Sequence, residues 1–446
     1  MTNATDPVRG NEIAMYNRDR DGDLRLVGYF PTGVLSNTEP QLGSGPAPTA
    51  QIFRLATGGA LPLVSAQFDG LGSSNSLILS QDNRCLFAVN AGSNTVSSFR
   101  VRDDGLNLVS VADSRGVFPA SLALDDNLLY VLNAGDAGNL AGFRVHDCAL
   151  QPLHNAVVAL DDFTDPTSFP IPAPNEVLTT PAQISFTPDG RRLVLSIKGL
   201  DGAAFGPNGA LQSLPNGRMV VFPVHGNGRL GTAKITQFSF AAGTGGPFSF
   251  VFTGARTLVV VHANSGTIAS FTIQNNNSLV LTQNQAPLAA EGFAPCWLDS
   301  NGRFVYAASF GAPSGVLEII GQGAGLPDLN GTLTGFRVKY DGTLEPLGVT
   351  VHYPAPPVGT GNHAIDVRVI DNYLYFIQPR TGMIGRLTIR HNGALTDMVH
   401  FGGLTPGLEP FAGLNPGINN FLERCFPTGN GSPECLQGSA QGIAGF

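Results

Sequence analysis

The chain has 446 residues and a formal net charge of −8, so it could form two or three ordinary domains or one large repetitive domain. Glycine (56) and proline (32) make up about a fifth of the chain and charged residues only 13%, which excludes a disordered chain, a coiled coil and a charged tail. No run approaches about 18 consecutive apolar residues, and the lysines are Lys198, Lys234 and Lys339, so we expect neither a membrane span nor a broad nucleic-acid surface.

The N-terminal segment, 1–32, reads as the end of one strand followed by two further strands around the turn RDRDGD. Six later stretches share one pattern: an apolar strand, a tight Asp/Asn/Gly turn, a second strand ending in a polar residue, and two more strands joined by a similar turn. The second of them begins ASLALDDNLLYVLNAG. These copies begin at Asn75, Ala120, Ala182, Phe248, Pro295 and His363.

The ends of the second strands set the repeat. The shortest spacing, about 43 residues from Asn90 to Asn133, suits a four-stranded propeller blade. The chain is therefore predicted to be an all-β protein, a seven-bladed β-propeller with four-stranded blades. The first unit lacks an inner strand, and we expect the C-terminal AQGIAGF to supply it. The aligned positions are Asn3, Asn90, Asn133, Ile197, His262, Ser309 and Gln378.

We expect one propeller domain spanning 1–446. Insertions concentrate on the connections at one end of the blades, which predicts a lid of loops over a pocket there. A decorative role or an interaction surface is the alternative for these loops. The blades are expected at 1–32 with 440–446, 74–113, 118–160, 181–240, 247–288, 294–353 and 362–402, with long loops 33–73 and 403–439 over one face.

The phrases AVNAGSNTVSSFRV, YVLNAG, PAQISFTPDGRRLV and FAPCW resemble the lactonase-type propeller family, which includes 6-phosphogluconolactonase and the fungal 3-carboxymuconate lactonizing enzyme. The opening MTN…GNEIAMY is most similar to the fungal muconate-cyclase-like branch. The resemblance implies lactone hydrolysis or cycloisomerisation of an unsaturated carboxylate. Where the phosphogluconolactonase branch carries Pro-His and Pro-Arg-His, this chain has Pro119-Ala120-Ser121 and Pro181-Ala182-Gln183, which disfavours a phosphosugar lactone.

In a propeller, the starts of inner strands and the loops after second strands face the mouth of the central channel. His363, His262 and Lys198 occupy such positions and are the candidate catalytic residues. Several cations at one mouth of an acidic chain predict a carboxylate-bearing small-molecule substrate. The candidate substrate-binding residues are Arg115, Arg380, Gln183, Asn90, Asn133, Phe118, Phe248 and Trp297.

These residues fit either direction of the chemistry. For hydrolysis, His363 or His262 would activate water, and Lys198 with Asn133 would stabilise the oxyanion. For cycloisomerisation, a histidine or Lys198 would donate a proton while arginines clamp the carboxylates. No G-x-S-x-G motif favours a covalent serine. The structural alternatives are that His262 forms a hydrogen bond to a neighbouring blade and that each cation is a solvated loop charge or a tie between blades.

A non-catalytic propeller that binds a protein or ligand through its decorated loop face is the alternative function. It would be favoured by an apolar or blocked channel mouth, whereas a deep pocket lined by His363, Lys198 and Arg380 would favour the enzyme.

The cysteines give weaker signals. Cys85 and Cys296 lie in apolar strands and are expected to be buried thiols, and Cys425 and Cys435 flank a short Pro/Gly-rich loop that could close a disulfide. No Cys/His spacing suits zinc and no acidic cluster suits calcium, so no metal or cofactor is expected. A leader is expected to be absent or already removed, which fits either a cytoplasmic or a secreted protein.

Overall fold

The structure is a computed structural model, and its arrangement follows the predicted repeat. The secondary-structure elements in the described part of the chain are all β-strands, apart from one 3₁₀ turn, Ala91–Ser93. None of these elements is a helix that could span a membrane. The structure describes residues 2–6, 10–33, 71–160, 181–199, 204–205, 211–212, 217–238, 244–263, 265–283, 286–287, 295–309, 331–352, 364–378, 383–402, 425–427, 433–435 and 440–445.

The strands in the first half of the chain form sheets that begin next to the central axis and end at the rim. Three of these sheets follow the chain directly: β4(Leu77–Leu79), β5(Cys85–Asn90), β6(Thr95–Arg102) and β7(Gly105–Asp113); β8(Pro119–Asp125), β9(Leu128–Asn133), β10(Asn139–His146) and β11(Ala149–Ala159); and β12(Pro181–Phe186), β13(Arg192–Ile197), β16(Arg218–Pro223) and β17(Lys234–Gln237). A separate two-stranded sheet joins β14(Ala204–Phe205) to β15(Leu211–Gln212).

The second half repeats this order, and one sheet there has a fifth strand. The five-stranded sheet contains β18(Pro247–Phe252), β19(Thr257–His262), β20(Thr267–Ile273), β21(Leu279–Leu281) and the short β22(Ala286–Pro287). Two four-stranded sheets follow: β23(Pro295–Ser300), β24(Phe304–Ser309), β25(Thr332–Val338) and β26(Leu344–His352), then β27(Ile365–Ile370), β28(Tyr373–Gln378), β29(Met383–Ile389) and β30(Leu395–Phe401). A two-stranded sheet pairs β31(Cys425–Pro427) with β32(Pro433–Cys435).

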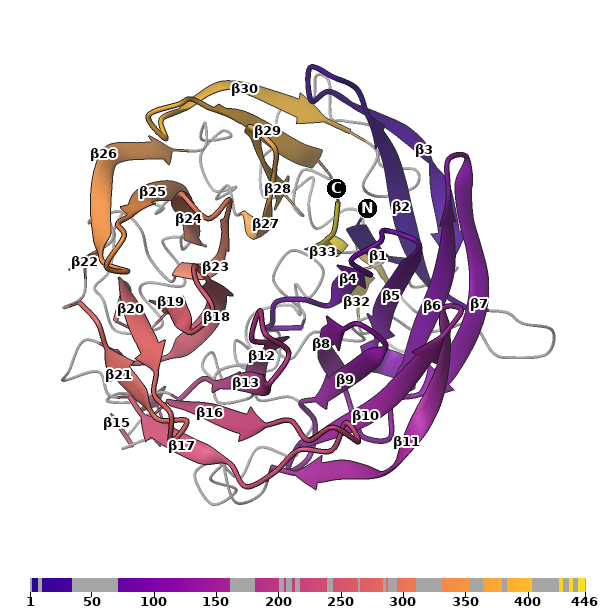
Figure 1. Ribbon diagram of the computed structural model, residues 1–446. Coiled ribbons are helices and arrows are strands. Elements are labelled where there is room, and N and C mark those ends of the chain that lie inside the picture. The colour runs from indigo at the N-terminus through magenta and orange to yellow at the C-terminus, as the bar shows by residue number, and fades with distance from the viewer. Residues whose placement is uncertain are drawn as a thin grey trace.

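One further four-stranded sheet is built from both ends of the chain. Its order is β33(Ala440–Ile443), β1(Thr2–Asp6), β2(Gly10–Arg18) and β3(Leu24–Pro31). β33 runs antiparallel to β1 and places Thr2 opposite Ile443. The innermost strands contact one another in the order β4, β8, β12, β18, β23, β27 and β33, and β33 in turn contacts β4. The sheets are therefore arranged in a ring around an axis, with both termini near that axis (Figure 1).

The strand register identifies the two ends of the ring. Pro119 at the start of β8 lies opposite Asn133 at the end of β9, and Pro247 at the start of β18 lies opposite His262 at the end of β19. We call the end at which innermost strands begin and second strands end the upper end, and the opposite end the lower end. A register shift follows the first residue or two of β8, β12, β18, β23 and β27, so the same bulge recurs near the upper end.

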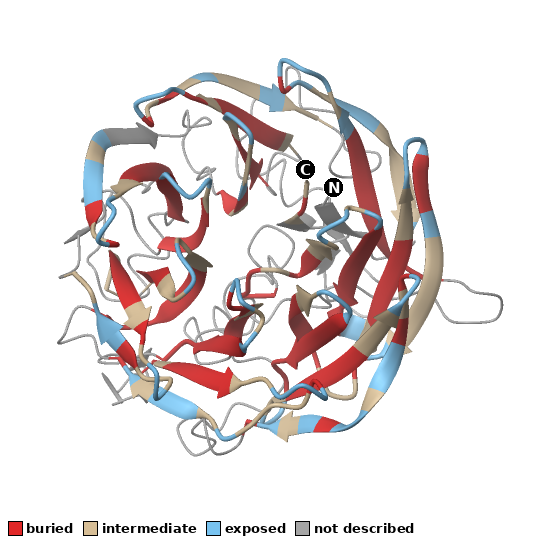
Figure 2. Ribbon diagram, in the orientation of Figure 1, coloured by how far each residue is buried: buried red, intermediate tan, exposed pale blue. Residues whose placement is uncertain are grey.

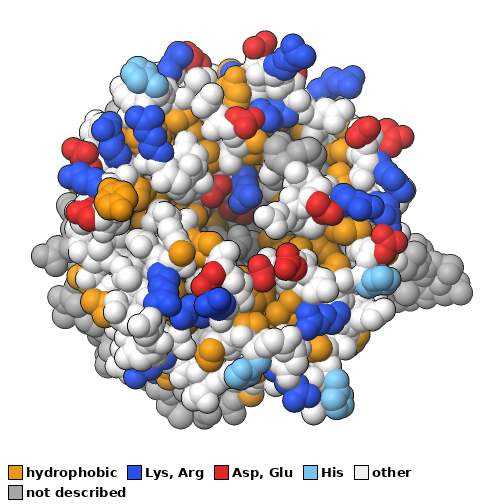
Figure 3. All heavy atoms as spheres, viewed as in Figure 1, with side chains coloured by type: hydrophobic (Ala, Val, Ile, Leu, Met, Phe, Trp, Pro, Cys, Tyr) orange, Lys and Arg blue, Asp and Glu red, His pale blue; other side chains and the backbone are white. Residues whose placement is uncertain are grey.

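Burial follows the sheets outward. Among the residues whose burial is described, the second and third strands of the sheets are largely buried, whereas the outermost strands and the turns are mostly intermediate or exposed (Figure 2). The apolar core is divided into clusters that lie mainly between neighbouring sheets, as expected when four-stranded units bury their faces against each other. Lys, Arg, Asp and Glu side chains are interspersed around the face shown in Figure 3.

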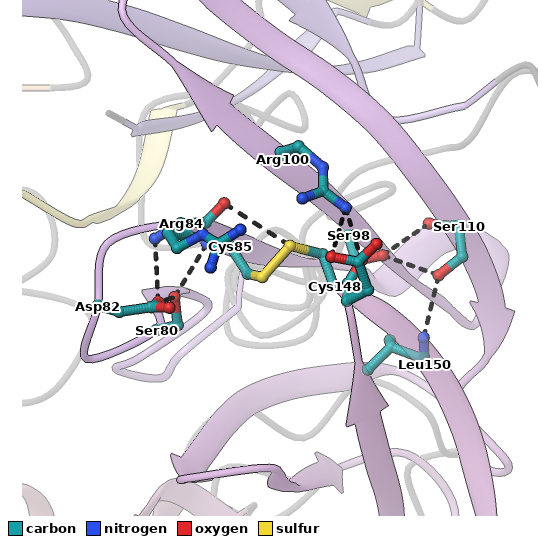
Figure 4. Close-up of a disulfide and its surroundings, with 10 residues drawn as sticks. Ser80, Asp82, Arg84, Cys85, Ser98, Arg100, Ser110, Cys148 and Leu150 are labelled. Carbon is teal, nitrogen blue, oxygen red and sulfur yellow. Dashed lines mark hydrogen bonds and ion pairs between the residues drawn. A yellow bond between two sulfur atoms is a disulfide. The ribbon is translucent and has the colours of Figure 1, made fainter.

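Two cysteine predictions can be compared with the structure. Cys296 is a buried thiol, as expected. The expectation for Cys85 is wrong, because Cys85 at the start of β5 forms a disulfide with Cys148 in the β10–β11 turn (Figure 4). The two Cα atoms are 5.3 Å apart, so the bond links two neighbouring sheets through cysteines that are 63 residues apart in the sequence. Cys425 and Cys435 lie opposite each other in the β31–β32 register, but their side chains lie outside the described part of the structure, so that disulfide stays a prediction.

Candidate functional site

Three of the predicted site residues meet at the upper end of the ring. Lys198 directly follows β13, Phe248 is the second residue of β18 and Trp297 is the third residue of β23. The Lys198 ammonium lies 4.8 Å from the centre of the Phe248 ring, and that ring packs edge-on against Trp297 with centroids 5.5 Å apart. All three side chains are buried, with Lys198 only 5% exposed. A cation held on aromatic faces away from water exerts a stronger field than one at the surface.

A segment of backbone that we did not expect completes this cluster. Residues 71–76, which we call the axial segment, lead into β4 and run between the innermost strands of several sheets. The Ser74 amide donates to the carbonyl of Ala182 on β12 at 3.0 Å, and the Ser73 hydroxyl donates to the carbonyl of Ala120 on β8 at 2.8 Å. Since β8 and β12 belong to the two sheets that follow β4 in the ring, the segment is fixed to both.

The same segment also reaches the far side of the ring. Lys198 Nζ donates to the Gly72 carbonyl, and Trp297 Nε1 donates to the Ser73 carbonyl at 3.1 Å. The strand that carries Trp297 borders the axis next to β18 and β27, not next to β4. The axial segment therefore crosses the axis and occupies part of the upper end where the sequence predicted an open channel mouth.

His262 lies in a different environment from Lys198. Its side chain has no exposed surface and lies between Phe238 and Phe271, with ring centroids 5.6 and 6.0 Å away. Burial lowers the pKa of His262 to about 3. The imidazole therefore stays neutral throughout the physiological range, packed between aromatic rings of two neighbouring sheets, and the predicted hydrogen bond to a neighbouring blade stays a prediction.

Three polar residues predicted to bind substrate hold the framework together. Gln183 bonds both backbone groups of Phe250, donating to its carbonyl at 2.8 Å and accepting from its amide at 3.0 Å, which ties β12 to β18. Asn90 donates to Ser97 at 2.8 Å and accepts from Asn11 at 2.8 Å. These amides are therefore fully engaged in binding strands and neighbouring sheets.

Asn133 and Arg115 serve a neighbouring loop. Asn133 Nδ2 donates to the carbonyl of Ser114 at 2.9 Å and to Asn139 Oδ1 at 2.8 Å. Arg115 has a φ of 63° and donates to the carbonyl of Leu153 at 3.1 Å. Asn133 thus fixes the connection that carries Arg115, and the Arg115 guanidinium is directed toward β11 of the same sheet.

The remaining candidates divide between the core and the part that is not described. Phe118 is buried, has a φ of 58° and donates a hydrogen bond from its backbone amide to Asn94 Oδ1 at 2.8 Å. His363 and Arg380 lie outside the described residues, although the buried Ala364 follows His363 directly. Within the described ranges, no group of three His, Cys, Asp or Glu side chains is placed to hold a metal ion.

A groove at the lower end is distinct from this cluster. It has a volume of about 860 Å³ and surrounds the disulfide, with charged side chains from the short turns along its edges. Arg100 and Asp147 on that edge pair with each other at 2.7 Å. The groove lies at the opposite end from Lys198, so the two cannot act on one ligand.

Sequence reasoning missed the axial segment because it read residues 33–73 as a loop over one face. The signal that could have found it is the run GLGSSNS just before β4. Such small side chains let backbone approach several inner strands at once, where bulkier residues would collide.

These features define a β-propeller with four-stranded blades and a buried cationic cluster at its upper end. Residues 49–205 match the model of the family described as "Lactonase, 7-bladed beta-propeller". The matched region includes both the axial segment and Lys198. No curated protein matches the sequence.

Solved structures resemble the chain over most of its length. The periplasmic gluconolactonase of Pseudomonas aeruginosa is 17% identical with a TM-score of 0.55, and the alignment covers 89% of this chain and 95% of that one. A proposed 6-phosphogluconolactonase from Bacteroides uniformis is 14% identical with a TM-score of 0.56, covering 90% of this chain and 97% of that one. At these identities the likeness establishes the fold alone.

Proposed function

We propose that the whole chain is a lactonase-family propeller that hydrolyses a lactone at its upper end. The observation that carries the proposal is the buried Lys198 ammonium, which lies within the segment matched by the lactonase family model. The name of the Pseudomonas aeruginosa gluconolactonase supports the same class of reaction for a related fold.

The chemistry follows from what hydrolysis of a cyclic ester requires. Water adds to the lactone carbonyl, whose oxygen becomes an oxyanion, and the ring C–O bond then breaks to give a hydroxy carboxylate and a proton. Lys198, on the Phe248 ring and away from bulk water, would stabilise the oxyanion strongly. His363 is the proposed base that activates water, because its sequence position at the start of an expected inner strand is one predicted to face the channel mouth. The neutral, buried His262 has no part in this scheme.

Carboxylate binding and the alternative reaction, cycloisomerisation, would use residues at the same end. A carboxylate on the substrate would be held by Arg115 and Arg380. Cycloisomerisation of a muconate would use the same groups in nearly the reverse direction, with Lys198 or His363 as the proton donor. A place in the muconate-cyclase-like branch rests on the opening of the sequence alone.

A non-catalytic propeller is the second candidate, and one observation favours it. The axial segment crosses the upper end and accepts a hydrogen bond from Lys198 itself. If that arrangement persists in solution, the protein would bind a partner through its loops without turnover.

We further propose that the five-stranded sheet is one of seven blades and that residues 1–446 form one domain. Pairing of β33 with β1 would then close the ring by joining the two ends of the chain. The hydrogen bond from the Ile443 amide to Asp366 Oδ2, at 3.2 Å, supports this closure because it ties β33 to the neighbouring β27.

Proton release from lactones, and proton uptake by muconates, test the proposed function. The protein would be mixed with a panel of γ- and δ-lactones and cis,cis-muconates, with and without calcium. We expect proton release from at least one lactone. Lys198→Met should lower kcat/KM about 10²–10³-fold, the usual effect of removing an oxyanion donor. His363→Ala should lower it as well.

Lys234→Met is the matched control, because it makes the same substitution at an exposed lysine on β17. It should leave turnover unchanged. Turnover of muconates alone would replace hydrolysis by cycloisomerisation. Inactivity on every compound, or full activity of Lys198→Met, would overturn the proposal and favour the non-catalytic propeller.

A further inference from the structure

The axial segment is held at both ends of its central dipeptide by residues from different sheets. The Gly72 carbonyl accepts from Lys198 and the Ser73 carbonyl accepts from Trp297. Gly72 and Ser73 are consecutive, so a shift of one carbonyl moves the other. The indole N–H of Trp297 is thus connected to the Lys198 ammonium through two adjacent peptide units that meet at Ser73.

A second path links the same two side chains. The Trp297 ring packs against Phe248 with an interplanar angle of 69°, and Phe248 also contacts the Lys198 ammonium, which lies 4.8 Å from the ring centre. The carbonyl of Phe248 accepts from the hydroxyl of Ser196 at 2.5 Å, which fixes β18 to β13 just before Lys198. Lys198 is therefore positioned by the Gly72 carbonyl and by the Phe248 ring, and Trp297 packs against that ring and bonds the next carbonyl along the chain, that of Ser73.

Burial makes the indole hydrogen bond important for this arrangement. A carbonyl buried away from water needs a donor, and losing that donor favours any movement that brings the carbonyl to water or to another group. The Ser73 carbonyl lies next to a fully buried tryptophan, so movement of the axial segment is its main way to recover a partner. Such movement would carry the Gly72 carbonyl, and with it the preferred place of the ammonium.

We propose that Trp297 is a positioning residue, which holds the axial segment through its indole N–H and so sets the place of the Lys198 ammonium at the upper end. This inference rests on the proposed function only for the consequence in catalysis. The positioning itself concerns the protein without substrate. A misplacement of a catalytic group by about 1 Å can cost on the order of 10²-fold in rate.

The chain offers a direct measurement, because Lys198 is accompanied by only two other lysines, Lys234 and Lys339. Brief acetylation with limiting acetic anhydride, followed by mass spectrometry of peptides, gives the rate of each lysine in one sample. Lys234 and Lys339 are exposed and serve as internal standards. In the wild type, Lys198 should react far more slowly than either of them.

Trp297→Phe keeps a ring against Phe248 and removes the N–H. We expect the acetylation rate of Lys198, relative to the two standards, to rise about tenfold, the factor that corresponds to losing one buried hydrogen bond. Ser73→Ala removes the bond to Ala120 and should raise the rate by a smaller factor. This milder variant keeps the test available if Trp297→Phe fails to fold.

Phe250→Leu is the matched control, since it trims a buried ring on β18 that does not contact the axial segment. It should lower thermal stability without changing the relative rate of Lys198. An equal rise in this control, or no rise in Trp297→Phe and Ser73→Ala, would overturn the positioning role. If a lactone substrate is found, Trp297→Phe should also lower kcat about 10–100-fold with little change in KM. Absence of any substrate would leave the labelling result unaffected, so the two proposals fail separately.

Discussion

Asp366 provides the strongest pH-dependent prediction in the molecule. It is the second residue of β27, has a φ of 58°, and accepts hydrogen bonds from the amides of Val367 at 3.0 Å and Ile443 at 3.2 Å. Burial raises the pKa of its carboxyl to about 7, against an ordinary value of 3.8, although the two amide bonds and Arg368 act in the opposite direction. This carboxyl joins β33 to β27, so its charge state affects the link between the end of the chain and the ring.

The raised pKa of Asp366 determines how the stability of the protein changes with pH. A carboxyl whose pKa is higher in the folded state binds its proton more tightly when folded. Its contribution to stability is therefore complete below about pH 3.8 and is lost as the pH rises through about 7. A shift of about 3 pKa units corresponds to about 4 kcal/mol. Because Asp366 as a whole residue is only partly buried, we expect about 2 kcal/mol of this to be expressed between pH 5 and 8.5.

Asp366→Asn is the informative variant, since asparagine tolerates the left-handed backbone and cannot ionise. Urea unfolding would be measured for both proteins between pH 5 and 8.5. We expect the wild type to lose about 2 kcal/mol more than the variant over this range. The variant is also expected to start from lower stability at pH 5, because its amide group can accept only one of the two backbone N–H groups.

Asp104→Asn, at an exposed turn, is the control and should keep the pH dependence of the wild type. Parallel curves for wild type and Asp366→Asn would refute the reasoning. They would mean that the carboxyl is solvated well enough to ionise at its ordinary pKa in the folded protein.

Three further predictions concern the framework. Cys148→Ser opens the loop closed with Cys85 and should lower the free energy of unfolding by up to about 4 kcal/mol, the chain-entropy value for a loop of this length. Urea unfolding with and without reductant measures this loss. If reductant destabilises the variant as much as it destabilises the wild type, the prediction is wrong. Gln183→Leu leaves both backbone groups of Phe250 without partners and should cost about 2–4 kcal/mol, whereas a cost below that of an ordinary surface change would contradict the bidentate bond. Gly385→Ala places a methyl group into the ring of the phenylalanine opposite it on β28 and should lower thermal stability by about 1–3 kcal/mol, and an unchanged melting temperature would show that the ring can move aside.

The fold was accessible from the sequence because its determinants are local. Each unit carries its own strands and turns, so the alternation of apolar runs with Asp/Asn/Gly turns predicted β8 and β9 to within a few residues. The position of polar residues at the ends of second strands was also predicted, and the register places Asn133 and His262 there. Because the same pattern recurs in each unit, several copies support each of these inferences.

The functions of those polar positions were not accessible in the same way. Asn90 and Gln183 lie at positions where a ligand-binding residue would be expected. The side chain of each instead forms hydrogen bonds to backbone or side-chain groups of neighbouring strands. Sequence position gives the end of the ring at which a side chain lies but not its partner, because the partner comes from another unit. The Cys85–Cys148 bond shows the same limit, since it joins the second strand of one unit to a turn of the next.

The upper end of the ring therefore contains two kinds of buried polar group with different consequences. Gln183, next to the repeated bulge, forms hydrogen bonds to the adjacent sheet. A substitution of Gln183 lowers stability because its partner is the backbone of a strand, which cannot move to find another donor or acceptor. Lys198 and Trp297 instead bond the axial segment, which belongs to no sheet and is held by a few hydrogen bonds from several strands. A segment held in that way can be displaced at lower cost than a strand, since no ladder of hydrogen bonds must break with it. For that reason we expect substitutions at Lys198 and Trp297 to affect reactivity more than stability, and those at Gln183 to do the reverse.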